Sequence, residues 1–276
     1  MRVGEDGERT RAALAAAAFR AGDLIGGIDA PGRATDRLSW TLAETAAHMV
    51  VGLRAFGDSL RGDMDGWNAN LTDLPEFHLR LAAMTASTLA AVPEREPAAL
   101  ARLLREAAGG FLRASEGLPA DHLVATPWYG DGASLRLDAA TALLLGEQLI
   151  HGRDLAVSLR RPWPISRAEA LLVVPAAATM MPRAVRPEAT RDLDLTFAFH
   201  LRGGTGFAMR VLHGAALREP LGQRRADCHI SFDPLAFLLV GYGRMSPWAA
   251  VARGGALAYG RRPWLAFRFK KLFHNP

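Results

Sequence analysis

Residues 143–154, an otherwise apolar helical stretch, place a carboxylate and an imidazole, Glu147 and His151, four positions apart. On a helix, two side chains at this spacing lie one above the other on the same face. A second histidine, His48, lies in the middle of another apolar helical stretch, residues 40–51, where a lone polar ring needs a partner. Together, the three side chains look like three ligands of one metal ion.

Apolar residues recur at helical spacing through most of the first 160 residues. The pattern predicts five helices separated by Gly, Pro and Asp clusters, over residues 9–25, 41–60, 74–91, 97–116 and 137–159. Ser39 and Trp40 give a start signal for the second helix, and Pro97 occupies a first-turn position that accepts proline. These segments predict an antiparallel helical bundle.

The helical pattern ends at residues 160–164, which include two prolines, so we expect a domain junction there, with domains over residues 1–160 and 161–276. A helix over residues 166–180 is followed by period-two segments, residues 193–199 and 206–212, joined by a turn at residues 202–205; they predict a hairpin. Residues 228–232 predict a further strand. Asp233 and Pro234 then open a short helix that ends near Val240. The expected fold class is α+β, a helical bundle followed by a small α+β domain.

Amino-acid composition indicates the cell compartment and excludes some types of metal site and cross-link. The single cysteine, Cys228, excludes an internal disulfide and a cysteine-rich zinc site, and suits a reducing compartment. The Ala-rich stretch at residues 12–19 follows acidic residues, where a signal peptide would be basic, so we interpret it as the first helix. No run reaches the roughly 18 to 20 apolar residues of a membrane span. We expect a cytoplasmic protein.

Charge is unevenly divided along the chain. Residues 1–160 carry 16 Lys and Arg against 21 Asp and Glu, a balance of −5, whereas residues 161–276 carry 17 against 7, a balance of +10. Nearly all the cations are arginines, which grip carboxylates and phosphates through a planar fork. The basic half therefore suits an acidic small substrate or a nucleic acid. Because its cations occur as scattered pairs, such as Arg224-Arg225, without a known reading motif, we expect no nucleic-acid partner.

The three-ligand pattern leaves two interpretations open. Metal sites in helical bundles use inward-facing His and carboxylate side chains, and three protein ligands leave a coordination position for water or substrate, as in catalytic zinc sites. Two histidines and a carboxylate also suit Fe²⁺ or Ni²⁺. In the alternative, Glu147 and His151 form a local hydrogen-bonded pair, and His48 is a satisfied core imidazole.

A family resemblance adds to this pattern. Residues 39–48 and 147–156 resemble the mycothiol-dependent maleylpyruvate isomerase family, whose first domain is a DinB-like metal-binding four-helix bundle. Residues 227–260, with the turn Gly241–Arg244, look like the sterol-carrier-like second domain of the same proteins. The resemblance spans nearly the whole chain. It implies that the metal ligands are His48, Glu147 and His151.

The resemblance also implies a chemistry. In this family the ion, usually Zn²⁺, binds the sulfur of mycothiol, a low-molecular-weight thiol, and keeps it as a thiolate at neutral pH. The thiolate adds to an electron-poor double bond and leaves after rotation, which gives isomerisation, or remains attached, which gives S-transfer. The partners implied are mycothiol and a small electrophilic substrate. Two alternatives are a non-enzymatic binder of an apolar ligand, with a structural or lost metal, and a thiol-independent metal hydrolase.

Four further residues are candidates for the site. Asp154, three residues after His151, is either an acceptor for the ligand ring or a helix-surface acid. Arg244 is a candidate for gripping a carboxylate of the substrate or of the thiol cofactor; the alternative is a solvated turn residue. Asn68 and Asn70, on the loop after the His48 helix, are candidates for lining the mouth of the metal cavity, or are turn and cap residues.

Overall fold

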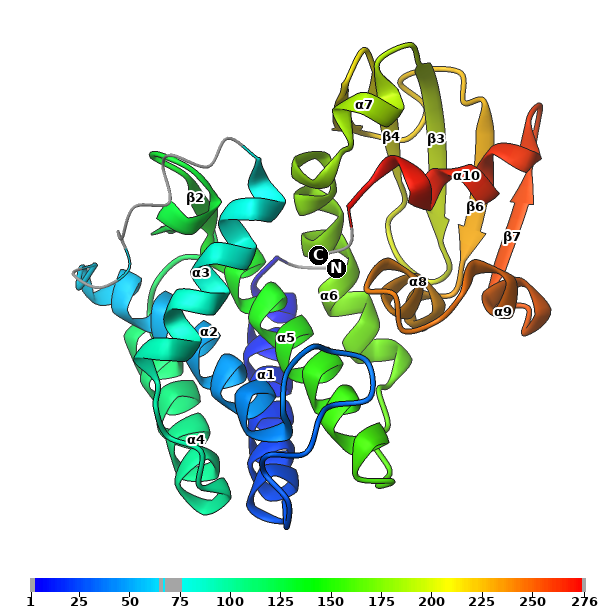
Figure 1. Ribbon diagram of the computed structural model, residues 1–276. Coiled ribbons are helices and arrows are strands. Elements are labelled where there is room, and N and C mark those ends of the chain that lie inside the picture. The colour runs from blue at the N-terminus through cyan, green and yellow to red at the C-terminus, as the bar shows by residue number, and fades with distance from the viewer. Residues whose placement is uncertain (1–2, 65–66, 68–75, 275–276) are drawn as a thin grey trace. The chain divides into compact units, whose positions relative to one another are not determined.

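The computed structural model describes residues 3–64, 67 and 76–274, and the chain divides into two compact units, residues 1–164 and 165–276 (Figure 1). The boundary lies at the end of the proline-containing segment in which the sequence analysis expects a junction. Within the described residues, no helix is both long and apolar enough to cross a membrane.

Five long helices make up most of the first unit. They are α1 (Val3–Gly26), α2 (Leu42–Arg61), α3 (Phe77–Ala91), α4 (Pro97–Ala114) and α5 (Leu137–Ser158). All five match helices predicted from the apolar period, although α1 begins earlier than predicted. Four of them contact one another in a ring, in the order α1, α4, α2, α5, and α3 packs against α2 (Figure 1). The predicted helical bundle is confirmed.

Local capping fixes where α2 begins and therefore which way its residues face. Thr41 is the N-cap: its hydroxyl accepts a hydrogen bond from the Glu44 amide at 3.2 Å, and the Glu44 carboxylate accepts one from the Thr41 amide at 2.7 Å. This reciprocal pair satisfies two amides that the helix leaves without partners. The hydrogen bonds from the backbone and hydroxyl of Thr41 lower the pKa of Glu44.

A two-stranded hairpin, β1 (Leu123–Ala125) and β2 (Ser134–Arg136), connects α4 to α5. The sequence analysis did not predict it, because strands of three residues are too short to show a period-two pattern. A short 3₁₀ turn inside the hairpin carries Trp128, which is buried edge-on against Phe56 of α2, with 5.1 Å between ring centroids. This contact attaches the hairpin to the bundle.

The second unit is a five-stranded mixed sheet with short helices. Its elements are α6 (Arg167–Met180), α7 (Pro187–Thr190), β3 (Asp194–Leu201), β4 (Phe207–Leu212), β5 (Ala215–Glu219), β6 (Cys228–Phe232), α8 (Pro234–Gly241), α9 (Pro247–Ala252), β7 (Ala256–Tyr259) and α10 (Ala266–Phe269). The strand order is β5-β4-β3-β6-β7, with β3 parallel to β6 and the other neighbours antiparallel (Figure 1).

The predicted hairpin, the predicted strand and the predicted short helix are all confirmed in this unit, as β3–β4, β6 and α8. Asp233 caps α8 by accepting hydrogen bonds from the amides of Leu235 and Ala236. Strands β5 and β7, at the two edges of the sheet, were not predicted. One face of the sheet is an aromatic core, in which Phe199 contacts rings from β4, α8 and α10. The α+β fold class is therefore confirmed.

In the first unit, the segment after α5 folds back onto that helix beside His151. The Trp163 indole donates a hydrogen bond to the Leu149 carbonyl at 2.9 Å, and the Arg20 guanidinium lies over its ring at 4.8 Å. A Cβ added at Gly152 would overlap the indole. The glycine that follows His151 is thus required by close packing and not by backbone conformation.

We expect Gly152→Ala to lower the free energy of unfolding by about 1–3 kcal/mol, because the added methyl overpacks the helix against Trp163. The matched control is Gly110→Ala in α4, where nothing lies within 4 Å of the added atom. There alanine should raise the free energy of unfolding by up to about 1 kcal/mol through its higher helix propensity. Urea unfolding of both variants measures this, and equal effects at the two sites would contradict the packing argument.

Candidate metal centre

Two contacting helices of the bundle bring the three predicted ligands together. His48 comes from α2, whereas Glu147 and His151 come from α5, one turn apart. Their ligand atoms all lie within 4.8 Å of one another. The Glu147 Oε2 atom is 3.5 Å from Nε2 of His48 and 3.3 Å from Nε2 of His151. The spacing of residues 147 and 151 therefore places both side chains on the face of α5 that meets His48.

The centre is recessed but open on one side. The side chains of His151 and His48 are 12% and 20% exposed, and that of Glu147 is 35% exposed. The imidazole rings lie edge to face, with 4.9 Å between their centroids. Glu147 is thus the most exposed side chain of the three.

Burial and the neighbouring charges separate the pKa values of the three groups. Burial lowers the pKa of His48, so its imidazole is neutral at pH 7. Burial alone would raise the pKa of Glu147 and lower that of His151. Hydrogen bonds from the two histidines instead hold the pKa of Glu147 well below its usual range, and contacts with Asp154 and Glu147 raise the pKa of His151 to about 9. Without a cation, His151 is therefore the positive charge of the cluster.

Asp154 is not a surface acid. Its side chain is fully buried, and its Oδ2 atom lies 3.3 Å from Nδ1 of His151. Because Nδ1 faces Asp154, the other ring nitrogen, Nε2, faces Glu147. A carboxylate beyond the ligand ring in this position is the usual way in which proteins fix the tautomer of a metal-binding histidine.

Trp40 lies beside the centre, although its only predicted role was that of a helix start signal. Its ring lies 4.9 Å from that of His48 and 6.1 Å from that of His151, and it is partly buried. The indole therefore forms an apolar wall beside both imidazoles. The only available signal was its position directly before the N-cap Thr41.

The residues present fit a divalent cation. Two neutral imidazoles with the carboxylates of Glu147 and Asp154 carry a formal charge of −2, which a divalent ion neutralises. Nitrogen and oxygen donors in this combination suit zinc, and also iron or nickel. The Glu147 carboxylate contacts both imidazoles, so His48 belongs to the same cluster and is not a separate core imidazole.

A comparison with protein families identifies the chain. The family model described as the mycothiol maleylpyruvate isomerase N-terminal domain matches residues 7–156, which is more than half of the sequence. The chain belongs to the mycothiol-dependent maleylpyruvate isomerase family. The matched range contains all three candidate ligands and Asp154, and it ends before the second unit.

Solved structures of this family share the fold of both units. A crystal structure of the mycothiol-dependent maleylpyruvate isomerase matches with a TM-score of 0.55 and 14% identity, over 94% of this chain and 95% of that chain. A histidine-to-alanine mutant of that enzyme matches over the same shares with a TM-score of 0.54 and 14% identity. No curated protein sequence matches the chain. At this identity, the likeness shows a shared fold over both units.

Of the remaining predicted site residues, only Arg244 is among the described residues. Arg244 belongs to the second unit, in the turn after α8, where its Nη1 atom donates a hydrogen bond to the Tyr242 carbonyl at 2.6 Å. Asn68 and Asn70 lie outside the described residues. Their roles in binding stay predictions.

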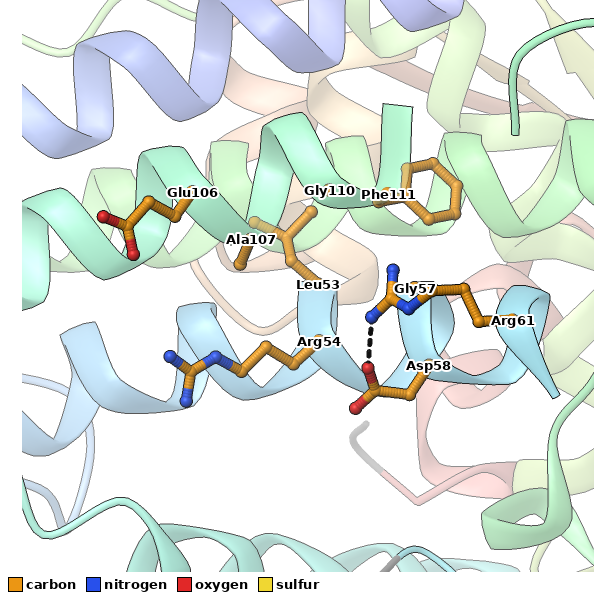
Figure 2. A pocket seen from close by; sticks show the side chains of 9 residues that line it. All are labelled: Leu53, Arg54, Gly57, Asp58, Arg61, Glu106, Ala107, Gly110 and Phe111. Carbon is orange, nitrogen blue, oxygen red and sulfur yellow. Dashed lines mark hydrogen bonds and ion pairs between the residues drawn. The ribbon is translucent and has the colours of Figure 1, made fainter. Parts of the chain in front are cut away.

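A separate groove of about 350 Å³ lies between α2 and α4 (Figure 2). Figure 2 shows that its charged side chains come from both helices and that Arg61 pairs with Asp58 inside it. Gly57 and Gly110 form part of its lining. None of its lining residues is a metal ligand, so the groove is not part of the candidate metal centre.

We expect Zn²⁺ binding at pH 7 to release about one proton per site, because His151 is protonated in the metal-free protein and must lose that proton to become a ligand. Its pKa, raised to about 9, also gives the sign of the pH effect. Proton release falls as the pH rises through about 9, and the apparent affinity rises with pH below that value. Isothermal titration calorimetry in buffers of different ionisation enthalpy measures the release. A binding heat independent of the buffer at pH 7 would contradict the assignment.

Proposed function

We propose that this chain is a divalent-metal enzyme that uses mycothiol to attack a small electrophilic substrate and isomerise it. The observation that carries the proposal is the convergence of His48, Glu147 and His151 from two helices in a member of this family. The solved relative is named as a mycothiol-dependent maleylpyruvate isomerase, so maleylpyruvate is the first substrate to test. S-transfer begins with the same attack and differs only in whether the thiol leaves again.

Zinc is the proposed ion, held by the two histidines and Glu147. When bound, the cation supplies the positive charge that lowers the pKa of a thiol and keeps it as a thiolate at neutral pH. Other residues of the chain orient the candidate ligands and shield them from water. Asp154 orients His151 through Nδ1, and Trp40 limits the access of water to the imidazoles. The partly exposed Glu147 marks the side from which thiol and substrate enter.

The thiol has to come from outside the chain. The only cysteine, Cys228, lies on β6 in the second unit with its side chain fully buried. Burial raises the pKa of this thiol to about 11, so it stays protonated and unreactive at neutral pH. A small external thiol is therefore the nucleophile that the proposal requires.

Arg244 is our choice for binding a carboxylate of the substrate or of mycothiol. Its guanidinium lies near Lys270, whose pKa is lowered by burial and by the charge of Arg244. Two cations that repel each other in a partly buried setting favour an anion between them. Asn68 and Asn70 stay candidates for the thiol-binding loop.

The first experiment measures metal content and thiol dependence together. Purified wild type should contain about one zinc per chain and isomerise maleylpyruvate only when mycothiol is present. His151→Ala should lose both the metal and the activity, because it removes a ligand. His122→Ala, a matched change outside the centre, should keep both.

Other outcomes select the competing functions. Turnover without any thiol would support a metal hydrolase. A reconstituted wild type that holds no metal would contradict the enzyme proposal and favour a binding protein.

A second test addresses Asp154. We expect Asp154→Asn to weaken zinc binding by about 10–100-fold, as is typical when the carboxylate behind a metal-binding histidine is lost. The variant should also release less than one proton on binding zinc at pH 7, because Asp154 is the first of the contacts that raise the pKa of His151. Asp138→Asn, at the start of the same helix and paired with Arg136, is the control. Unchanged proton release in Asp154→Asn would show that Asp154 has only a packing role.

A further inference from the structure

The last part of the second unit combines exposed aromatic rings with an excess of positive charge. Residues 234–276 contain seven Lys and Arg residues and no Asp or Glu. We propose that this part of the surface binds the face of a lipid bilayer that contains anionic phospholipids. The proposal does not depend on the thiol chemistry of the first unit.

The apolar part of this surface, which we call the aromatic patch, consists of Trp248, Val251, Trp264 and Phe267. The exposed fractions of Trp248 and Trp264 are 65% and 59%, and those of Val251 and Phe267 are 42% and 37%. The rings of Trp248 and Phe267 stack with 4.2 Å between centroids, which joins α9 to α10. Trp264 lies one turn before Phe267, and Val251 one turn after Trp248. Four exposed apolar side chains thus lie on α9, on α10 and on the turn before α10, and large apolar side chains grouped on a surface mark an interaction site.

Cations surround the aromatic patch. Arg253 follows α9, Arg268 lies four residues after Trp264, and Lys271 lies four residues after Phe267; all three are exposed. Arg261 and Arg262 share one carboxylate, that of Asp227, the residue directly before β6. One negative charge thus opposes two positive charges there, and the net charge around the patch stays strongly positive.

This combination matches the chemistry of a bilayer surface. Tryptophan rings settle at the level of the lipid headgroups, and arginine and lysine reach the phosphates while their stems cover apolar surface. Charge attraction to anionic lipid adds to the burial of the apolar side chains. Since no helix of the described residues is suited to span a membrane, the contact would be peripheral.

Other occupants fit less well. A symmetric pair of chains would place the same cations against each other, because a two-fold interface uses the same patch on both copies. For a single-stranded nucleic acid, the stacked Trp248 and Phe267 already cover one face of each other's ring, so less ring surface is free for bases.

The test uses the full chain and co-sedimentation with unilamellar vesicles. We expect binding to phosphatidylcholine vesicles that contain about 30% phosphatidylglycerol, weakening as salt is added, and no binding to pure phosphatidylcholine. The double variant Arg268→Ser/Lys271→Ser should bind about 30-fold more weakly, at about 1 kcal/mol per cation. Arg191→Ser/Arg225→Ser removes the same charge from exposed positions elsewhere in this unit and should bind almost as the wild type does.

The aromatic side chains are tested separately. Trp264→Ala/Phe267→Ala should lower vesicle binding by about tenfold or more, since it removes most of the apolar area that enters the headgroup layer. Leu217→Ala, an exposed apolar residue on β5, should not change it.

Three results would overturn the proposal: equal binding to both vesicle types, equal loss in the two arginine-containing double variants, or binding of single-stranded nucleic acid in place of vesicles. Sedimentation velocity supplies a further check. A dimer that Trp264→Ala/Phe267→Ala dissociates would assign the aromatic patch to a second copy of the chain.

Discussion

The contact between α2 and α5 is the interaction on which the candidate centre depends. It brings His48 against Glu147 and His151 with Asp154 behind them, so that two carboxylates share a recess between helices. Such a cluster is expensive to bury unless its charges are compensated. Protonation of His151 compensates part of the charge, and a divalent cation would compensate all of it. The recess therefore favours metal binding, because a cation would offset the free-energy cost of burying carboxylates and imidazoles in an apolar bundle.

The surrounding structure holds these groups in place through local features that have nothing to do with metal. The Thr41–Glu44 cap fixes the start of α2, and the packing of Trp163 on Gly152 holds the chain after α5 against the helix beside His151. Most of α5 is buried, so its stability comes from apolar contacts and not from the polar cluster. The candidate ligands therefore lie on a helix that apolar packing holds in place.

Features with a local physical signal were predictable from the sequence. The helices, the β3–β4 hairpin and the shared face of Glu147 and His151 follow from periodicity alone. Features that depend on distant neighbours were not. Strands β5 and β7 are short edge strands that the adjacent strands define, and the hairpin of β1 and β2 depends on the packing of Trp128 against Phe56. Likewise, the spacing of Asp154 from His151 left its burial open, and nothing local indicated that Trp40 would lie over His48.

Charge is unevenly divided between the two parts of the chain. A protein that needs only solubility gains most from interspersed charges of both signs. Here residues 161–276 carry 17 Lys and Arg against only 7 Asp and Glu, and residues 234–276 have no acidic residue at all. Repulsion among these cations lowers the free energy of unfolding of the second unit. Bound anions would reduce this repulsion. A carboxylate held at Arg244 and lipid phosphates around the aromatic patch would each stabilise the second unit in this way.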